Sequence, residues 1–285
     1  MKKYFFLFVS ICLIVNNLFA SVDTLAVYSP SMDREMPAAV VLPDCYPDND
    51  NSYPVIYLLH GAYGDYLDWL VKLPDDGVVK SLADKYRVIF VLPEGGNFSF
   101  YLDSPWDDSS QHETHVIKEL IPYIDHHYRT LNKPEGRVIT GLSMGGQGAL
   151  YLAARNPHLF GAAGSMSGAV HLDINSWDLP EDVIERFAQS FRETMGAESI
   201  DSGFLAKNSA TELVAIMKEN AMPLIIDCGV DDFLISANRE LNRRLNEYNV
   251  PHDYIERPGR HDWPYWQNAL LYHVLFFAEF FKSRH

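Results

Sequence analysis

Ser143 lies at the centre of the segment VITGLSMGGQGALYL (residues 138–152) and has the surroundings of an enzymatic nucleophile. Residues 141–145 fit the pattern G-x-S-x-G, after a β-type run and before apolar residues with helical spacing. A turn this tight needs glycines, because a Cβ would strike the adjoining strand or helix. A bare motif would also suit a serine that only caps a helix, but the strand–turn–helix context favours the nucleophile.

A serine hydroxyl needs a base to be nucleophilic at neutral pH, and the base needs a carboxylate to orient it. Of the eleven histidines, His261 is the one downstream of Ser143 that lies in a loop between a strand and a helix. His252 begins a strand and His273 lies inside the last helical segment, so we expect structural roles for both. His261 is therefore the predicted general base.

The acid is expected in the loop CGVDDF (residues 228–233), which follows the strand before the one that leads to His261. Asp231 and Asp232 are adjacent there, and spacing alone leaves either as the partner of His261. The other is expected to cap the helix that follows at 233–248. Asp262, beside the base, is expected to bind the loop backbone.

Hydrolysis of an ester through a serine also needs two N–H donors for the oxyanion. The N–H of Met144, directly after the nucleophile, is one candidate. The other is the N–H of Ala62 in the loop LLHGAYG (58–64), where Gly61 permits a sharp turn. His60 is then expected to be structural, beneath this hole.

The segment HETH (112–115) looks like a metal-binding helix, but its histidines are three residues apart and the zinc protease motif needs four. We therefore expect a helix start there and no metal. The formal net charge of −15 argues against nucleic acid or an anionic membrane as partner. Cys45 lies in a polar loop and Cys228 at the end of a strand, which favours two separate thiols.

Short apolar runs alternate with longer helical patterns, which predicts an α/β fold with a mostly parallel sheet covered by helices on both faces. Residues 171–220 interrupt this alternation and predict a helical insertion over the upper edge of the sheet. Strands are expected at Thr24–Tyr28, Ala38–Leu42, Val55–Leu59, Val88–Leu92, Arg137–Thr140, Ala162–Met166, Leu224–Asp227 and Asp253–Glu256, and helices at 76–85, 113–128, 145–155, 234–248 and 264–282.

Residues 1–20 combine Lys2 and Lys3 with an apolar run and end in Ala20, as a cleavable secretory signal does. The apolar run is short for a bilayer crossing, so we expect a secreted or periplasmic protein without stable membrane insertion after cleavage. Residues 21–285 are expected to form a single domain.

Together these segments make the chain resemble the esterase D-like branch of the α/β-hydrolases, which includes S-formylglutathione hydrolases, feruloyl and acetyl-xylan esterases, enterochelin esterases and mycolyltransferases. The resemblance is carried by YLLHG (57–61), PEGGN (93–97), ELIPYID (119–125), 141–148, 229–234 and HDW (261–263). Relatives often carry GTEDF at the acid loop, which aligns Asp232 with the catalytic aspartate. The resemblance implies the α/β-hydrolase fold and hydrolysis of acyl esters without a cofactor.

An export signal fits poorly with cytosolic S-formylglutathione hydrolysis, so secreted carbohydrate esterases are the closer match by context. The resemblance thus predicts a serine carboxylesterase that acts on acyl esters of carbohydrates or other small alcohol or aryl compounds. Acyl transfer to a sugar, with the same triad, is an alternative, as is a non-catalytic glycan-binding protein. Candidate substrate contacts are Tyr63, Trp69, Asn97, Phe98, Tyr101, Asp103, Trp106, Trp263 and Trp266. For Trp69 and Trp266, packing within the domain is an equal alternative, and for Asn97 shaping of the loop together with Gly95 and Gly96 is favoured over contact with substrate.

Overall fold

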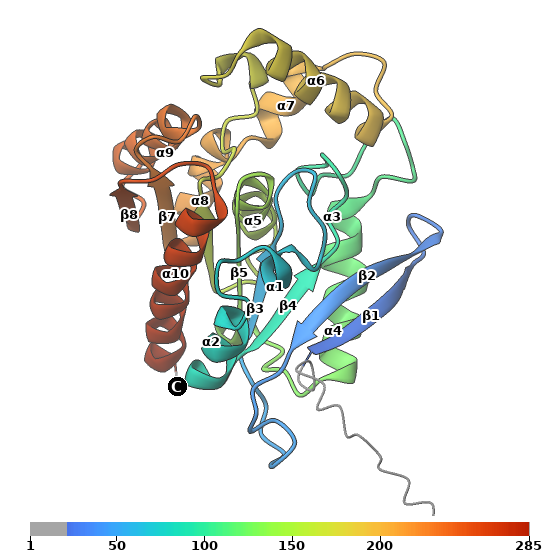
Figure 1. Ribbon diagram of the computed structural model, residues 1–285, viewed down its shortest axis with the longest axis vertical. Coiled ribbons are helices and arrows are strands. Elements are labelled where there is room, and N and C mark those ends of the chain that lie inside the picture. The colour runs from blue at the N-terminus through green and yellow to red at the C-terminus, as the bar shows by residue number, and fades with distance from the viewer. Residues whose placement is uncertain (1–21, 285) are drawn as a thin grey trace, which may run out of the picture.

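The computed structural model describes residues 22–284, so the predicted signal at 1–20 lies outside the described residues. An eight-stranded sheet runs through the described part in the order β1-β2-β4-β3-β5-β6-β7-β8 (Figure 1). The pairs β1–β2 and β2–β4 are antiparallel, and all other neighbours are parallel. The strands are β1 (Val22–Ser29), β2 (Arg34–Val41), β3 (Val55–Leu59), β4 (Ile89–Pro93), β5 (Arg137–Gly141), β6 (Ala162–Met166), β7 (Leu224–Gly229) and β8 (His252–Arg257).

All eight predicted strands are present, and most of their ends agree to within one or two residues. The exception is β2, which begins at Arg34 rather than Ala38. The residues that it adds form a hairpin with β1, in which Ser29 faces Arg34. Arg34 and Glu35 are exposed and charged, and Pro37 is only partly buried, so the apolar pattern used to find strands did not extend to these residues.

Helices cover both faces of the sheet, as predicted (Figure 1). Along β3 the side chains alternate between two apolar clusters, with Tyr57 in one and Leu58 in the other. The first cluster contains side chains of residues 115–120 and of helices α4 to α9, and the second those of α1, α2 and α10. The helices are α1 (Asp68–Val71), α2 (Val78–Tyr86), α3 (His112–Thr114), α4 (Ile121–His127), α5 (Met144–Arg155), α6 (Glu181–Met195), α7 (Ser202–Asn208), α8 (Val214–Asn220), α9 (Ile235–Glu247) and α10 (Trp263–Ser283).

The helix predicted at 113–128 is present as α3 and α4, joined by a π-helical stretch at His115–Leu120. The short helix α1 was not predicted, because four residues carry too little periodicity. Among residues 22–284, no helix has both the length and the apolar composition that a bilayer crossing requires. Cys45 and Cys228 are separate free thiols, as the sequence favoured, and burial raises the pKa of Cys228.

The predicted insertion at 171–220 is helical and contains α6, α7 and α8 between β6 and β7. In Figure 1, α6 and α7 lie above the end of the sheet where the parallel strands finish. The helix α6 buries Ala188, Phe191 and Met195 on one side and exposes charged residues on the other. It ends at Gly196, whose positive φ of 63° suits a helix C-terminus. The insertion therefore forms a cover over the carboxyl ends of the strands.

The turn between β5 and α5 holds Ser143 in a conformation rare for a residue with a side chain, with φ 53° and ψ −117°. Its glycines allow this close packing. A Cβ on Gly141 would lie 2.7 Å from the carbonyl group of Gly145, and one on Gly145 would lie 2.5 Å from the carbonyl oxygen of His60. The loop after β3 and the turn after β5 are thus in backbone contact.

Replacing Gly145 with alanine should therefore destabilise the protein by about 1–3 kcal/mol, because the new methyl group meets backbone atoms that cannot rotate away. Urea denaturation followed by circular dichroism measures this change. Gly203→Ala in α7 is the control: its Cβ would meet a single side-chain oxygen at 3.2 Å, and alanine favours helix. Equal stability of Gly145→Ala and the wild type would contradict the packing described for this turn.

Candidate active site

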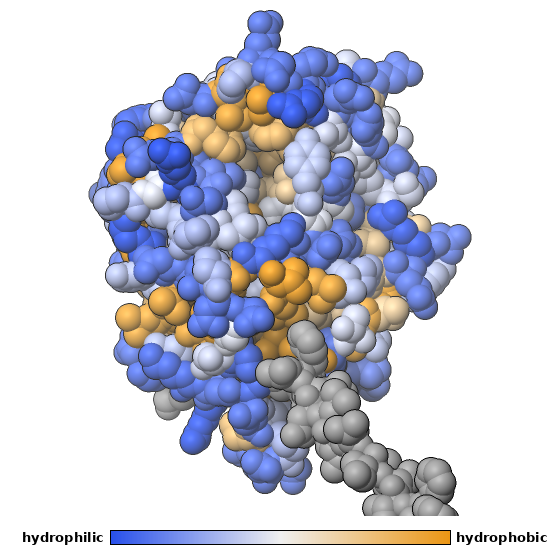
Figure 2. Space-filling model, in the orientation of Figure 1, coloured by the Kyte–Doolittle hydropathy of each residue, from blue (hydrophilic) through white to orange (hydrophobic). Residues whose placement is uncertain are grey.

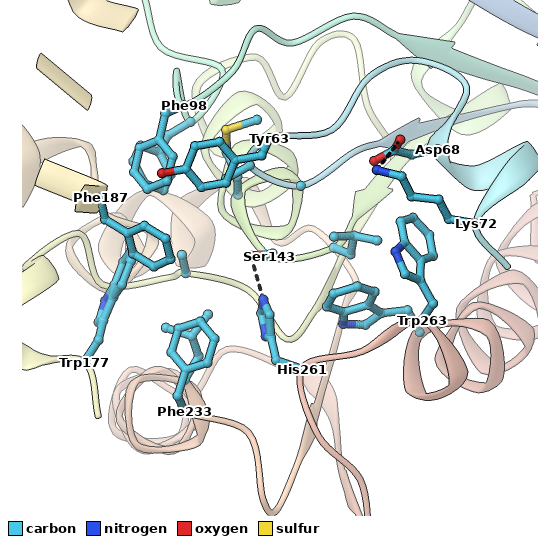
Figure 3. A pocket seen from close by; sticks show the side chains of 18 residues that line it. Tyr63, Asp68, Lys72, Phe98, Ser143, Trp177, Phe187, Phe233, His261 and Trp263 are labelled. Carbon is cyan, nitrogen blue, oxygen red and sulfur yellow. Dashed lines mark hydrogen bonds and ion pairs between the residues drawn. The ribbon is translucent and has the colours of Figure 1, made fainter. Parts of the chain in front are cut away.

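The structure brings together the three residues that the sequence selected as nucleophile, base and acid. The His261 Nε2 atom lies 2.9 Å from the Ser143 Oγ atom (Figure 3). The other ring nitrogen, Nδ1, lies 2.8 Å from Oδ2 and 3.0 Å from Oδ1 of Asp232. This gives a continuous chain of hydrogen bonds from the serine hydroxyl through the imidazole to the carboxylate.

Asp232, and not Asp231, is the partner of His261. Asp232 is buried, whereas Asp231 is exposed. Asp232 Oδ1 also accepts the N–H of Leu234 at 2.9 Å, just before α9. One carboxylate thus orients the histidine and holds the start of the helix, and the expected division of these tasks between the two aspartates is wrong. Asp262 caps α10 by accepting the N–H of Tyr265.

The loops that carry Asp232 and His261 are packed against each other. The Asp231 N–H donates to the carbonyl of Gly259 at 3.0 Å, and a Cβ on Gly229 would lie 2.4 Å from that same oxygen. Two aromatic rings flank the imidazole, Phe233 at 4.5 Å and Trp266 at 4.9 Å between centroids. The backbone contact and the two rings fix both the position and the tilt of His261.

The two predicted oxyanion donors lie beside Ser143. A Cβ on Gly61 would be 3.4 Å from the Ser143 Cβ, which places the Gly61–Ala62 loop against the nucleophile. Ala62 and Met144 line the same cavity as Ser143. Within residues 22–284, neither backbone N–H donates to another backbone carbonyl. Both donors are therefore available to a substrate oxygen.

His60 is a buried structural residue beneath this loop, as expected. Its Nδ1 contacts the carbonyl of Gly61 at 2.8 Å, and its Nε2 accepts the N–H of Gly95 at 2.8 Å. The Tyr101 hydroxyl accepts the backbone N–H of His60 at 3.0 Å. These bonds link the Ala62 loop to the loop after β4 and limit its movement.

A cavity of about 220 Å³ opens above Ser143, and Figure 2 shows the surface hollowed beneath α6 with apolar side chains at its rim. The cavity has two walls, one aromatic and one with charged side chains, and they lie on opposite sides of Ser143 and His261 (Figure 3). The aromatic wall consists of Tyr63, Phe98, Phe100, Trp177, Phe187 and Phe233, and the polar wall consists of Asp68, Lys72, Trp263 and Trp266.

Of the predicted substrate contacts, Tyr63, Phe98, Trp263 and Trp266 line this cavity. Tyr63 is half-exposed, and its hydroxyl lies 2.7 Å from the Ser190 Oγ of α6. This contact joins the loop after β3 to the insertion across the mouth of the cavity.

Trp69 and Tyr101 do not line the cavity, so the prediction of Tyr101 as a substrate contact is wrong, and for Trp69 the alternative of packing within the domain holds. Trp69 is fully buried and donates its Nε1–H to the carbonyl of Leu59. Tyr101 is also buried, with its hydroxyl on the backbone of His60. Both rings fill the core behind the site, because burying large aromatic side chains contributes strongly to stability.

Asp103 and Trp106 also lie outside the cavity, contrary to the sequence prediction, and so does Asn97, for which shaping of the loop was the favoured role. The Asn97 carbonyl accepts the N–H of Tyr63, so this residue shapes the neighbouring loop. Asp103 accepts the N–H and hydroxyl of Thr114 and thereby holds the start of a helix. Trp106 packs against Phe204 of α7.

Trp177, Phe187 and Phe233 form much of the aromatic wall, although none of them was predicted from the sequence as a substrate contact. Trp177 and Phe187 lie in the insertion, where no motif marks a site. Their packing is mutual: Phe187 lies 5.9 Å from Trp177 and 5.3 Å from Phe98 between ring centroids. The apolar spacing of α6 was the available signal, but it does not tell a core contact from a cavity wall.

The two histidines of the HETH segment, His112 and His115, are both buried within the fold. Burial lowers the pKa of His112 to about 3, and the Nδ1 of His115 lies 2.9 Å from Glu119. Within the described chain, no three His, Cys, Asp or Glu side chains converge in a way suited to hold a metal ion.

Comparison with known proteins identifies the family of the chain. The family model described as "Putative esterase" matches residues 29–277. An acetyl esterase of Caldicellulosiruptor saccharolyticus is 30% identical over 256 residues, which cover 85% of this chain and 92% of that relative. A solved ferulic acid esterase is 29% identical, with a TM-score of 0.75 over 91% of this chain and 98% of its own.

The fold is also that of FphF, a fluorophosphonate-binding serine hydrolase of Staphylococcus aureus. The TM-score is 0.77 at 20% identity, over 90% of this chain and 98% of that structure. At this identity the likeness concerns the fold alone. With the family match and the acetyl esterase relative, the chain belongs to this esterase family of the α/β-hydrolases.

Proposed function

We propose that the protein is an exported serine carboxylesterase that hydrolyses acyl esters of carbohydrates or related small alcohols. The observation that carries this proposal is the hydrogen-bonded chain from Ser143 through His261 to Asp232, beside two unengaged backbone N–H groups. That combination supplies a nucleophile, a base and an oxyanion site at one point in the cavity. Membership of the esterase family supports the same reaction class.

In this mechanism the Ser143 Oγ attacks the ester carbonyl while the His261 Nε2 takes its proton. The buried Asp232 carboxylate accepts a hydrogen bond from the Nδ1–H of His261 and stabilises the positive charge that forms on the ring. The N–H groups of Ala62 and Met144 stabilise the oxyanion of the tetrahedral intermediate. His261 then protonates the leaving alcohol, and water, activated in the same way, releases the acid from Ser143.

We propose that the aromatic wall receives the acyl group, with an aryl acyl group such as ferulate favoured over a long alkyl chain. Phe98, Trp177, Phe187 and Phe233 offer ring faces and edges to a flat acyl group, and none of them carries a charge. The likeness to an acetyl esterase and to a ferulic acid esterase supports an acyl group of one of these kinds. A cavity of about 220 Å³ suits a small acid better than a large lipid.

Ser143→Ala should lower kcat/KM for p-nitrophenyl acetate by roughly a thousandfold or more, because the acyl-enzyme can no longer form. Asp232→Asn should lower it by about 10⁴-fold, since the amide favours the wrong imidazole tautomer. The matched variant Asp231→Asn changes an exposed side chain and should stay within about threefold of wild type.

Steady-state kinetics with circular dichroism spectra of each variant measure these effects. Retention of more than a few per cent of activity in folded Ser143→Ala would remove the serine mechanism. A larger loss in Asp231→Asn than in Asp232→Asn would instead exchange the roles of the two aspartates.

Phe187→Ala should lower kcat/KM for methyl ferulate relative to p-nitrophenyl acetate by about tenfold, because a ring contact to an aryl group is worth about 1 kcal/mol or more. Trp106→Ala is the matched control, since Trp106 packs on α7 outside the cavity. The ratio of the two kcat/KM values is the measured quantity. An equal effect of the two substitutions on that ratio would contradict the acyl assignment of the aromatic wall.

Export through a signal at residues 1–20 remains part of the proposal. Expression of the full chain in a bacterium should yield a periplasmic or extracellular protein whose N-terminal residue is Ser21, because Ala20 is the small residue before the expected cleavage. Intact-mass measurement of the protein from each cell fraction tests this. An uncleaved chain confined to the cytoplasm would contradict it.

A further inference from the structure

The polar wall has a composition that hydrolysis of a simple ester does not require. Asp68 and Lys72 form an ion pair with Nζ 2.8 Å from Oδ1, and both line the cavity beside Trp263 (Figure 3). They do not contact Ser143, His261 or Asp232 through any hydrogen bond in the described chain. Their place in the wall therefore points to substrate recognition.

The ion pair is unequal in its exposure, which makes it a poor stabilising device. The Asp68 side chain is 5% exposed, whereas that of Lys72 is 44% exposed. Desolvation of a buried carboxylate is unfavourable, and a half-exposed lysine offsets this only in part. A carboxylate kept at such a cost in the wall of an active-site cavity is available to bind a ligand.

The surrounding residues are shaped to hold this carboxylate in place. A Cβ on Gly64 would lie 2.3 Å from Asp68 Oδ2, so glycine makes room for the carboxylate beside the loop that carries Ala62. Trp263 is held in turn by Trp69 and Trp266, each nearly perpendicular to it, at centroid distances of 5.4 and 5.2 Å. The indole and the ion pair thus form a preorganised surface.

This surface has the chemistry of a sugar-binding site. A sugar hydroxyl both donates and accepts hydrogen bonds, so neighbouring hydroxyls can donate to Asp68 and accept from Lys72. The C–H face of a sugar ring can pack on the indole of Trp263. The charges of Asp68 and Lys72 are opposite and 2.8 Å apart, so their combined field is weak beyond the pair itself. Such a pair suits a neutral polyol better than an anion.

The position of Trp263 assigns this surface to the leaving group. Trp263 follows His261 by two residues, and His261 must protonate the departing oxygen. The opposite wall is aromatic and carries no charged side chain. An ester bound across Ser143 therefore has its apolar acyl group on the aromatic wall and its polar alcohol on the polar wall.

We propose that Asp68, Lys72 and Trp263 form the binding site for the alcohol part of the substrate, and that this alcohol is a neutral sugar. The inference rests on the proposed esterase function and adds to it the residues that bind the leaving group. Asp68 and Lys72 act here as specificity residues, since they bind the alcohol and take no part in the transfer of protons.

Two ester pairs that share an acyl group test the inference: methyl ferulate with the 5-O-feruloyl ester of methyl arabinofuranoside, and methyl acetate with an acetyl ester of methyl xyloside. In Lys72→Met and Asp68→Asn, the ratio of kcat/KM for the sugar ester to that for the methyl ester should fall about tenfold, mainly through KM. Lys282→Met, which removes an exposed lysine paired with Glu279 on α10, is the control and should keep the wild-type ratio.

A ratio within twofold of wild type in Lys72→Met would overturn the inference. So would an equal loss on both members of each pair, because it would mean that the ion pair only supports the Ala62 loop. Lys72→Met keeps the test open if Asp68→Asn does not fold, since Lys72 is half-exposed.

Failure of the esterase function itself would be recognised separately, by turnover that does not depend on Ser143 or by no turnover of any of the four esters. Titration of the wild type with methyl arabinofuranoside, followed by tryptophan fluorescence, would then decide the role of the polar wall. A saturable change that Lys72→Met abolishes would support a sugar site, and no saturable change would overturn it.

Discussion

The candidate active site depends on the backbone contact between the turn after β5 and the loop after β3. Gly141, Gly145 and Gly61 let these two segments approach so closely that Ser143 and the Ala62 N–H face the same point. Ser143 has an unfavourable φ of 53°, a conformation that costs about 1–3 kcal/mol. It is held by hydrogen bonds from its N–H to the Met166 carbonyl and to its carbonyl from the Ala169 N–H. The core of the sheet thus supports the strained backbone that presents Ser143, the proposed nucleophile.

The order of the strands then brings the other two groups to the same place. Because β5, β6, β7 and β8 are parallel neighbours, the loops after β7 and β8 leave the sheet at the same carboxyl end of the strands as Ser143. His261 and Ser143 are 118 residues apart in sequence, yet their side chains are hydrogen-bonded. The contact between the loops at Asp231 and Gly259 fixes the histidine relative to its acid. The relative positions of Ser143, Asp232 and His261 therefore depend on the strand order of the whole sheet.

These constraints explain what the sequence could predict. The positions of Ser143, His261 and the oxyanion loop follow from motifs in which backbone sterics permit few residue types. Spacing could not separate Asp232 from Asp231, because the two residues are adjacent. The family pattern favoured Asp232, and in the structure its burial and its hydrogen bonds to His261 distinguish it. The residues that line the cavity were harder to predict, because an aromatic residue in a long loop can either contact substrate or pack in the core. Tyr101 belongs to the core, whereas Phe187, on a helix without a motif, forms part of the aromatic wall.

The two walls of the cavity come from separate parts of the chain, and this separation has a functional consequence. Trp177 and Phe187 of the aromatic wall belong to the insertion, whereas the polar wall lies on α1 and on the first turn of α10. The Tyr63–Ser190 hydrogen bond is one link between the insertion and the loop after β3. Substitutions in α6 can therefore alter acyl preference without moving the ion pair of α1. If the alcohol is bound as we propose, acyl and alcohol specificity are separately adjustable around one fixed nucleophile.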